Sequence, residues 1–182
     1  MLQTDLEKYS NSWYKPGGTV FKRGVWFCVN ACFFASFFPF SRFKVFLLRL
    51  FGAEIGKGVV IKPSVNIKYP WKLKVGDYVW IGERVWIDNL DRIEIGSNSC
   101  LSQGAFLLCG NHNYKKTGFD LMTAPVTLAE GVWIGAHAIV CPGVVCNSHA
   151  VLAAGSVASK NLEAYCIYQG NPAQKVKERR LE

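Results

Sequence analysis

A branched apolar residue, once replaced by cysteine, recurs at every sixth position through most of this chain. A helix has a period near 3.6 and a strand a period of 2, so neither explains the spacing. A chain wound into triangular coils does, because each side takes six residues and points one at the axis. The pattern predicts an all-β fold, a parallel β-helix with triangular coils. Its interior register is Ile55, Ile61, Ile67, Val75, Ile81, Ile87, Ile95, Leu101, Leu107, Leu128, Ile134, Val140, Cys146 and Leu152.

Other positions of the six-residue repeat agree with this prediction. The residue after the apolar one is often glycine, which we expect to supply the turn geometry at a corner; examples are Gly56, Gly76, Gly82, Gly96 and Gly135. We predict three parts: an N-terminal helical cap at residues 1–54, the β-helix at residues 55–163 and a C-terminal tail at residues 164–182.

Two interruptions of the register indicate a functional face. Early coils repeat every 20 residues, and on their third side polar residues replace packing residues. Stacked coils lie about 4.8 Å apart, so these polar residues should cluster; they are Asp88, Asn89, Asp91, Arg92, Asn111 and His112. The register is then lost over residues 113–125, which predicts an ejected loop on the binding face. A wider, solvated corner is the alternative.

Charge and cysteine content narrow the class of protein. The formal net charge is +8 and the pI about 9.2. No nucleic-acid-binding motif accompanies the basic residues, and anionic cofactors or membrane surfaces explain the balance equally well. Seven cysteines without a CxxC pair do not form a disulfide framework, which favours a reducing cytoplasm.

The N-terminal part is apolar but a poor membrane span. Residues 24–40 carry no charge, yet their length is at the lower limit for a span, and Asn30 and Pro39 weaken it. Residues 41–51 form an amphipathic pattern that Gly52 ends. We predict two helices that cover the unpaired edge of the first coil. They either serve only as a cap or also make peripheral membrane contact through residues 20–51.

Of the three histidines, His112 is the candidate for catalysis. It ends the third coil, directly before the ejected loop and beside polar residues, where a general base near neutral pH is chemically useful. His137 and His149 occupy outward positions. Gamma-type carbonic anhydrases bind zinc with three histidines on such a fold, but they need a closely spaced pair. The spacings here are 25 and 12, so we predict no metal.

Several segments resemble the hexapeptide-repeat acetyltransferases, and most of all those of the colanic-acid exopolysaccharide type, relatives of the galactoside and maltose acetyltransferases. The resemblance covers residues 20–178. It rests on residues 50–56 (LFGAEIG), 82–89 (GERVWIDN), 110–114 (GNHNY), 132–135 (VWIG), 153–156 (AAGS) and 170–173 (GNPA).

This resemblance implies a left-handed β-helix and a homotrimer with acetyl-CoA in clefts between neighbours. It implies that His112 deprotonates a sugar hydroxyl, which attacks the thioester directly, and that Asp120 orients the imidazole. The backbone amide of Ala136 falls where the family binds the thioester carbonyl. The resemblance places six further residues at the cofactor, the last of them in the C-terminal tail: Trp133, Gly135, Ala154, Ser159, Lys160 and Lys177. Asn113 stands where relatives often have aspartate.

We therefore expect an acetyl-CoA-dependent O-acetyltransferase that acts on a sugar or lipid-linked glycan of a cell-surface polysaccharide precursor. Asp88, Asn89 and Tyr114 are the residues expected to hold the acceptor, although Asp88 and Asn89 also fit a corner-capping role. The expected location is the cytoplasm, with the inner face of the membrane as an option. Two alternatives remain: another small acceptor, such as a free sugar, a sugar amine or an antibiotic, or a noncatalytic β-helix scaffold.

Overall fold

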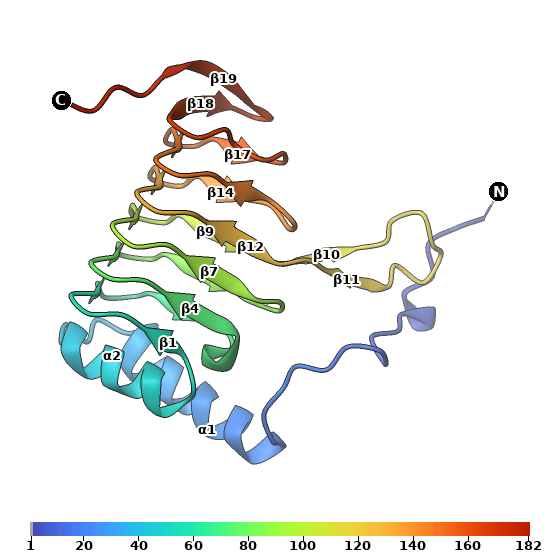
Figure 1. Ribbon diagram of the computed structural model, residues 1–182. Coiled ribbons are helices and arrows are strands. Elements are labelled where there is room, and N and C mark those ends of the chain that lie inside the picture. Colours follow the sequence, from blue (N-terminus) through green and yellow to red (C-terminus); the bar gives the residue numbers. More distant parts are fainter. Residues whose placement is uncertain (1) are drawn as a thin grey trace.

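The computed structural model describes residues 2–182, and they form the expected left-handed parallel β-helix of about six coils (Figure 1). Three parallel sheets make the sides of a triangular prism. Side 1 contains β1 (Glu54–Ile55), β4 (Leu73–Val75), β7 (Ile93–Ile95), β12 (Val126–Leu128) and β15 (Val145–Cys146). Side 2 contains β2 (Val60–Ile61), β5 (Trp80–Ile81), β8 (Cys100–Leu101), β13 (Trp133–Ile134), β16 (Val151–Leu152), β18 (Cys166–Gly170) and the antiparallel β19 (Ala173–Glu178). Side 3 contains β3 (Asn66–Ile67), β6 (Trp86–Asp88), β9 (Phe106–Leu108), β14 (Ile139–Val140) and β17 (Val157–Ala158).

The interior register predicted from the six-residue period is confirmed. On side 1, Ile55 pairs with Val75 and Val75 with Ile95, and the column continues through Leu128 to Cys146. Equivalent columns run up sides 2 and 3. Cys146 fills its aliphatic slot as a fully buried free thiol, and burial raises its pKa to about 12. Apolar burial along these columns is the main driving force for the fold.

The glycines at the corners are explained by a constraint other than the turn geometry expected from the sequence. Positive φ angles occur two residues further on, at Tyr78, Arg84 and Asn98 for example. At Gly135 a side chain is excluded because its Cβ would lie 2.5 Å from the backbone nitrogen of Ala154 in the next coil. Close stacking of coils, rather than a left-handed turn, therefore selects glycine there.

Helices close the open end of the first coil. The cap consists of α1 (Val20–Val29), the π-helical η2 (Asn30–Phe34) and α2 (Ser41–Leu50), after the short 3₁₀ turn η1 (Leu6–Lys8); a second such turn, η3 (Pro70–Lys72), lies within the β-helix. Trp26 Nε1 donates to the carbonyl of Ile67 at 2.9 Å, and Lys44 Nζ donates to that of Lys62 at 2.8 Å. These bonds satisfy backbone groups that would otherwise be unpaired. No helix within residues 2–182 is long and apolar enough to cross a membrane.

A hairpin leaves the prism where side 3 passes into side 1, and an N-terminal arm meets it (Figure 1). The hairpin pairs β10 (Gly110–His112) with β11 (Leu121–Thr123). The arm, residues 2–18, runs from the cap to the hairpin tip, where the Asp5 amide donates to the Thr117 carbonyl at 2.8 Å. Gly118 lets the arm pass, since a Cβ there would lie 2.7 Å from the Lys8 carbonyl oxygen.

Candidate active site

The hairpin fixes the position of His112 and provides a hydrogen-bond partner for one of its ring nitrogens. His112 pairs with Leu121 in the antiparallel ladder, and its ring stacks on that of Phe119 with centroids 4.4 Å apart and planes 8° apart. Nδ1 lies 2.9 Å from the Phe119 carbonyl oxygen. A carbonyl oxygen only accepts, so in this bond Nδ1 carries the hydrogen. In the neutral ring, Nε2 then keeps a free lone pair, which is what a general base requires.

Phe119 is held in an uncommon backbone conformation. Its φ is +53°, a left-handed value that bulky residues seldom adopt. Such local strain persists where neighbouring contacts enforce it, and it clusters at functional sites. Here the strained residue supplies both the stacking ring and the carbonyl that holds His112.

His112 lines a hollow of about 550 Å³ between the hairpin, the first three coils and the arm. Asp88 of the β-helix and Asn111 of the hairpin both line the hollow, so the polar cluster predicted on the third side is partly confirmed. Asp88 is 7% exposed, and its Oδ1 accepts from Lys68 Nζ at 3.0 Å. The carboxylate and amide therefore offer directed hydrogen bonds within reach of a hydroxyl-rich ligand.

The N-terminal arm supplies a wall of this hollow that sequence reasoning missed. Tyr9, Asn11 and Tyr14 line it, and the Tyr9 and His112 ring centroids lie 5.9 Å apart. Burial, followed by nearby Tyr69, raises the pKa of Tyr14, so the phenol stays neutral and donates to the Leu90 carbonyl at 2.7 Å. The only signal in the sequence was the polar and aromatic stretch ahead of Gly17 and Gly18.

The other members of the predicted polar cluster face elsewhere. Asn89 is fully buried; its Oδ1 accepts from the Tyr69 amide at 2.9 Å and its Nδ2 donates to the Tyr69 carbonyl at 2.5 Å. This arrangement favours the corner-capping alternative for Asn89. Asp91 accepts from Thr123 Oγ1 at 3.2 Å, and Arg92 forms ion pairs with Glu54 and Glu94. These three residues are absent from the lining of the hollow.

Asp120 does not contact the imidazole in this structure. Its Oδ1 accepts from the Ser10 amide and its Oδ2 pairs with Lys116 Nζ, both at 3.2 Å. In this structure the Phe119 carbonyl is the partner of the imidazole Nδ1, and Asp120 ties the arm to the hairpin. The orienting role expected of Asp120 stays a prediction. Tyr114, the third expected acceptor residue, is 75% exposed on the hairpin loop and does not line the hollow.

Three of the expected cofactor residues meet at another corner of the prism. Gly135, Ala136 and Ala154 lie where side 2 passes into side 3, and the Gly155 amide donates to the Ala136 carbonyl at 2.8 Å. The Ala136 amide itself has no hydrogen-bond partner among residues 2–182. Trp133 is half-exposed on adjoining β13, and its Nε1 donates to Ser102 Oγ at 2.9 Å.

The remaining expected cofactor residues are spread along the upper coils. Ser159 and Lys160 are exposed directly after β17, at the corner from which the hairpin also leaves but closer to the C-terminal end. Lys177 is exposed on β19 opposite Ile167. Within one chain, side 3 separates His112 from Ala136 and Ala154. The structure thus places the expected base and the expected cofactor residues on different corners, as two candidate half-sites.

Comparisons with known proteins agree with the fold and the motifs. No family model matches the chain. It is 42% identical to the "Putative colanic acid biosynthesis acetyltransferase WcaF" of Escherichia coli over 176 residues, 96% of this chain and 97% of that protein. A hexapeptide-repeat acetyltransferase of Vibrio cholerae, solved with acetyl-CoA, has a TM-score of 0.79 at 18% identity and covers 88% of each chain. A maltose O-acetyltransferase of Clostridium difficile has a TM-score of 0.76 at 21% identity over 89% of this chain and 88% of its own.

These similarities define the class of the protein. The chain belongs to the hexapeptide-repeat acetyltransferases, in the group that contains the colanic acid biosynthesis protein of Escherichia coli. It is accordingly an acyltransferase. The two solved structures, each under 25% identical, support the fold alone.

Proposed function

We propose that this enzyme transfers the acetyl group of acetyl-CoA to a hydroxyl of a sugar in a cell-surface polysaccharide precursor. The observation that carries the proposal is the bond from His112 Nδ1 to the Phe119 carbonyl. It leaves Nε2 as a base in a hollow lined by Asp88 and Asn111, whose side chains suit sugar hydroxyls. The name of the 42% identical relative points to the same acceptor class.

In the proposed mechanism, His112 Nε2 takes the proton of the attacking hydroxyl as its oxygen bonds to the thioester carbonyl carbon. The Ala136 amide, which has no internal partner among residues 2–182, donates to the carbonyl oxygen as negative charge develops there. When the carbon–sulfur bond breaks, the imidazolium returns the proton to the leaving sulfur. One histidine thus acts first as the base and then as the acid that protonates the leaving thiolate, and no acyl-enzyme forms.

Trp133, Gly135 and Ala154 form the proposed surface for the pantetheine arm. At this corner a side chain on Gly135 would collide with the Ala154 backbone nitrogen of the next coil, so Gly135 presents only backbone there. Further up the prism, Ser159, Lys160 and Lys177 are the proposed partners of the adenosine and its phosphates; the two lysines are exposed cations that suit phosphate groups.

The two half-sites lead us to include a homotrimer in the proposal. His112 and Ala136 lie on different corners of one prism, so they reach the same thioester if they belong to neighbouring chains. Met122 at 48% and Trp133 at 47% exposure leave apolar surface near the two corners. Phe119 stacks on His112 of its own chain. Sedimentation equilibrium tests the trimer; a monomer with full turnover contradicts it.

The cytoplasm is the proposed place of action. All seven cysteines are free thiols, Cys28 and Cys32 at exposed positions, as suits a reducing compartment.

A thiol-release assay tests the proposed reaction. Purified protein receives acetyl-CoA and a panel of free, nucleotide-linked and lipid-linked sugars, with a sugar amine and an antibiotic as further acceptors. We expect thiol release with at least one sugar and recovery of an acetyl ester on that sugar. Release only with the amine or the antibiotic would move the function to another acceptor, and no release together with no thermal protection by acetyl-CoA would favour a scaffold.

A further inference from the structure

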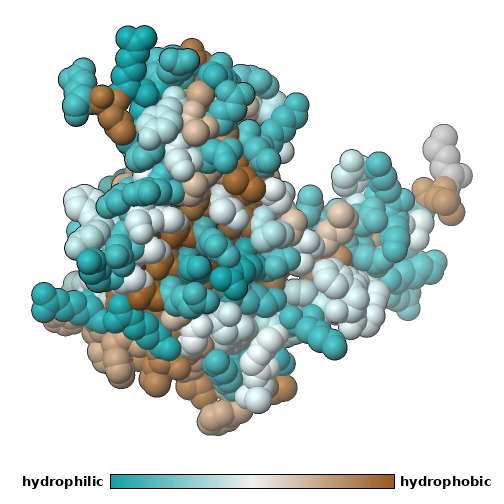
Figure 2. Space-filling view, in the orientation of Figure 1, coloured by the Kyte–Doolittle hydropathy of each residue, from teal (hydrophilic) through white to brown (hydrophobic). Residues whose placement is uncertain are grey.

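The outer face of the cap exposes large apolar side chains that are not needed to cover the first coil. Trp26, Phe34 and Leu48 already cover the first coil and are buried. The opposite face nevertheless exposes large side chains: Phe21 at 82%, Phe27 at 74%, Phe37 at 85%, Phe40 at 65% and Leu50 at 66%. Figure 2 shows apolar residues gathered at the cap end of the molecule, below the prism. Large apolar side chains exposed together on one end of a protein mark an interaction site.

Charge is segregated onto the same part of the chain. Residues 9–53 contain six lysines and arginines and no aspartate or glutamate, whereas the remainder contains fifteen cations and thirteen carboxylates. Residues 9–53 therefore carry six of the net eight positive charges, five in the cap and one, Lys15, in the adjoining arm. Lys44 is buried, but Arg42 and Arg49 are exposed. A surface that complements the cap must consequently be anionic as well as apolar.

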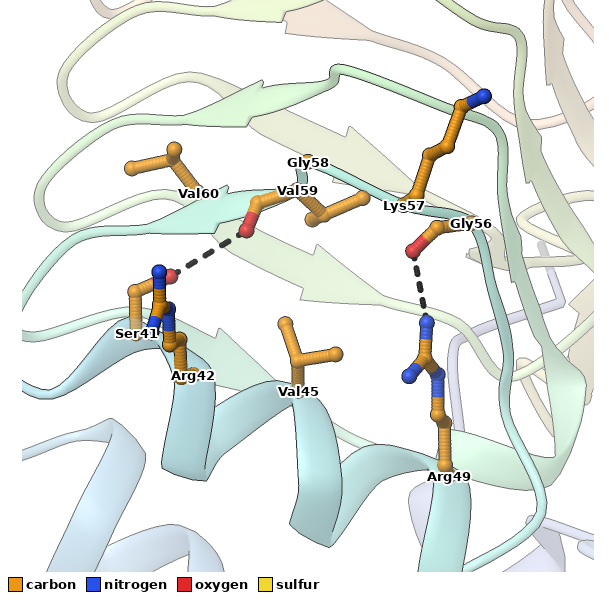
Figure 3. A pocket seen from close by; sticks show the side chains of 9 residues that line it. All are labelled: Ser41, Arg42, Val45, Arg49, Gly56, Lys57, Gly58, Val59 and Val60. Carbon is orange, nitrogen blue, oxygen red and sulfur yellow. Dashed lines mark hydrogen bonds between the residues drawn. The ribbon is translucent and has the colours of Figure 1, made fainter.

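A hollow of about 570 Å³ lies at the edge of this face, between α2 and the first coil (Figure 3). Arg42 and Arg49 rise from α2 on either side of Val45, and Lys57 comes from the first coil. Arg49 donates to the Ile55 and Gly56 carbonyls, while none of the ion pairs within residues 2–182 includes any of these three cations. The lining contains no carboxylate. Three cations without an acidic partner suit a phosphate group.

We propose that the cap docks on the surface of an anionic phospholipid bilayer. The exposed phenylalanines enter the boundary between headgroups and acyl chains, and a lipid headgroup phosphate occupies the hollow beside Arg42. Aromatic side chains on one face with cations at its edge are the composition of helices that lie in the membrane interface. Membrane docking is distinct from the proposed acetyl transfer, because the cap surface is separate from the hollow at His112.

Vesicle co-sedimentation of the full chain tests the proposal without acetyl-CoA or acceptor, so its result is independent of the proposed reaction. We expect binding to vesicles of equal parts phosphatidylcholine and phosphatidylglycerol, weaker binding to phosphatidylcholine alone, and loss of binding as salt rises. Arg42→Glu should weaken binding to the anionic vesicles by about tenfold. Phe21→Ser with Phe37→Ser should weaken binding to both by at least about tenfold.

Matched controls lie at the opposite end of the prism. Leu181 is 57% exposed and Arg180 is exposed in the C-terminal tail, so Leu181→Ser with Arg180→Glu removes equivalent groups and should leave vesicle binding within about twofold. Equal loss in the control, or no binding by the unaltered protein, overturns the proposal. A solution mass that halves on Phe21→Ser with Phe37→Ser also overturns it, because a second copy would then cover the face.

Discussion

Side 3 of the prism and the corner that follows it show two ways of placing side chains. On side 3, Ile67, Ile87 and Leu107 occupy one column because each strand pairs in register with the next. At the corner the chain leaves that register after Leu108 and returns at Val126. Between these points, His112 owes its position to Phe119 and to the arm. Repetition thus fixes the body, whereas contacts outside the repeat, with the hairpin loop and the arm, fix the candidate base.

The largest effect should come from the corner. His112→Ala should lower turnover by roughly 10²–10⁴-fold, the usual contribution of a positioned general base, while thermal unfolding stays nearly unchanged. Steady-state thiol release and a melting curve measure both. His149→Ala, which removes an imidazole from another corner, is the matched control. Equal rates for the two variants would remove His112 from the mechanism.

The body should respond in the opposite manner. Ile87→Ala opens a cavity in a fully buried column between Ile67 and Leu107. We expect it to lower the free energy of unfolding by about 2–5 kcal/mol, with kcat close to that of the unaltered protein below the melting range. Denaturant unfolding monitored by circular dichroism provides the measurement. A large fall in kcat without loss of stability would mean that body and corner are not separable.

Asn89 lies on the border between the two regions and sharpens the comparison. Asn89→Ala leaves the part-buried Tyr69 amide without its partner and removes one of the two donors to the Tyr69 carbonyl, the other being the Lys72 amide. This loss should cost about 1–3 kcal/mol of stability. The acceptor KM should change little, because Asn89 does not line the hollow. Asp88→Asn is the comparison variant, since Asp88 does line it. A raised KM with unchanged stability in Asn89→Ala would return Asn89 to the acceptor site.

The smallest expected effect is a pH dependence at the cap. Burial lowers the pKa of Lys44 from 10.5 to about 8, so the unfolded chain binds more protons than the folded one between these values. Stability contributed by this site therefore rises as pH increases from 8 to 10.5. The stability difference between Lys44→Met and the unaltered protein should shift in favour of the unaltered protein over that range. Urea unfolding at several pH values tests this, and a constant difference contradicts it.

The period of six was sufficient to predict the columns, because stacking makes each interior position repeat. It was also sufficient to place Asp88, Asn111 and His112 near one another. It did not predict the arm, because the bond from the Ser10 amide to Asp120 joins residues 110 positions apart without any repeat. The contact of the Phe119 carbonyl with His112 could not be predicted for a different reason, because a backbone acceptor has no signature in the side-chain pattern.

The reversed direction of β19 has a consequence for how the molecule ends. A stack of identical coils is a template on which another stack can grow, end against end, into a fibre. Helices stop such growth at one end. At the other, β19 turns back antiparallel along β18 and presents Lys175 and Lys177 on the outermost strand. Charged lysines on an edge strand oppose the addition of a further chain. The β-helix, whose geometry could otherwise extend into a fibre, therefore ends at both sides and keeps a fixed length.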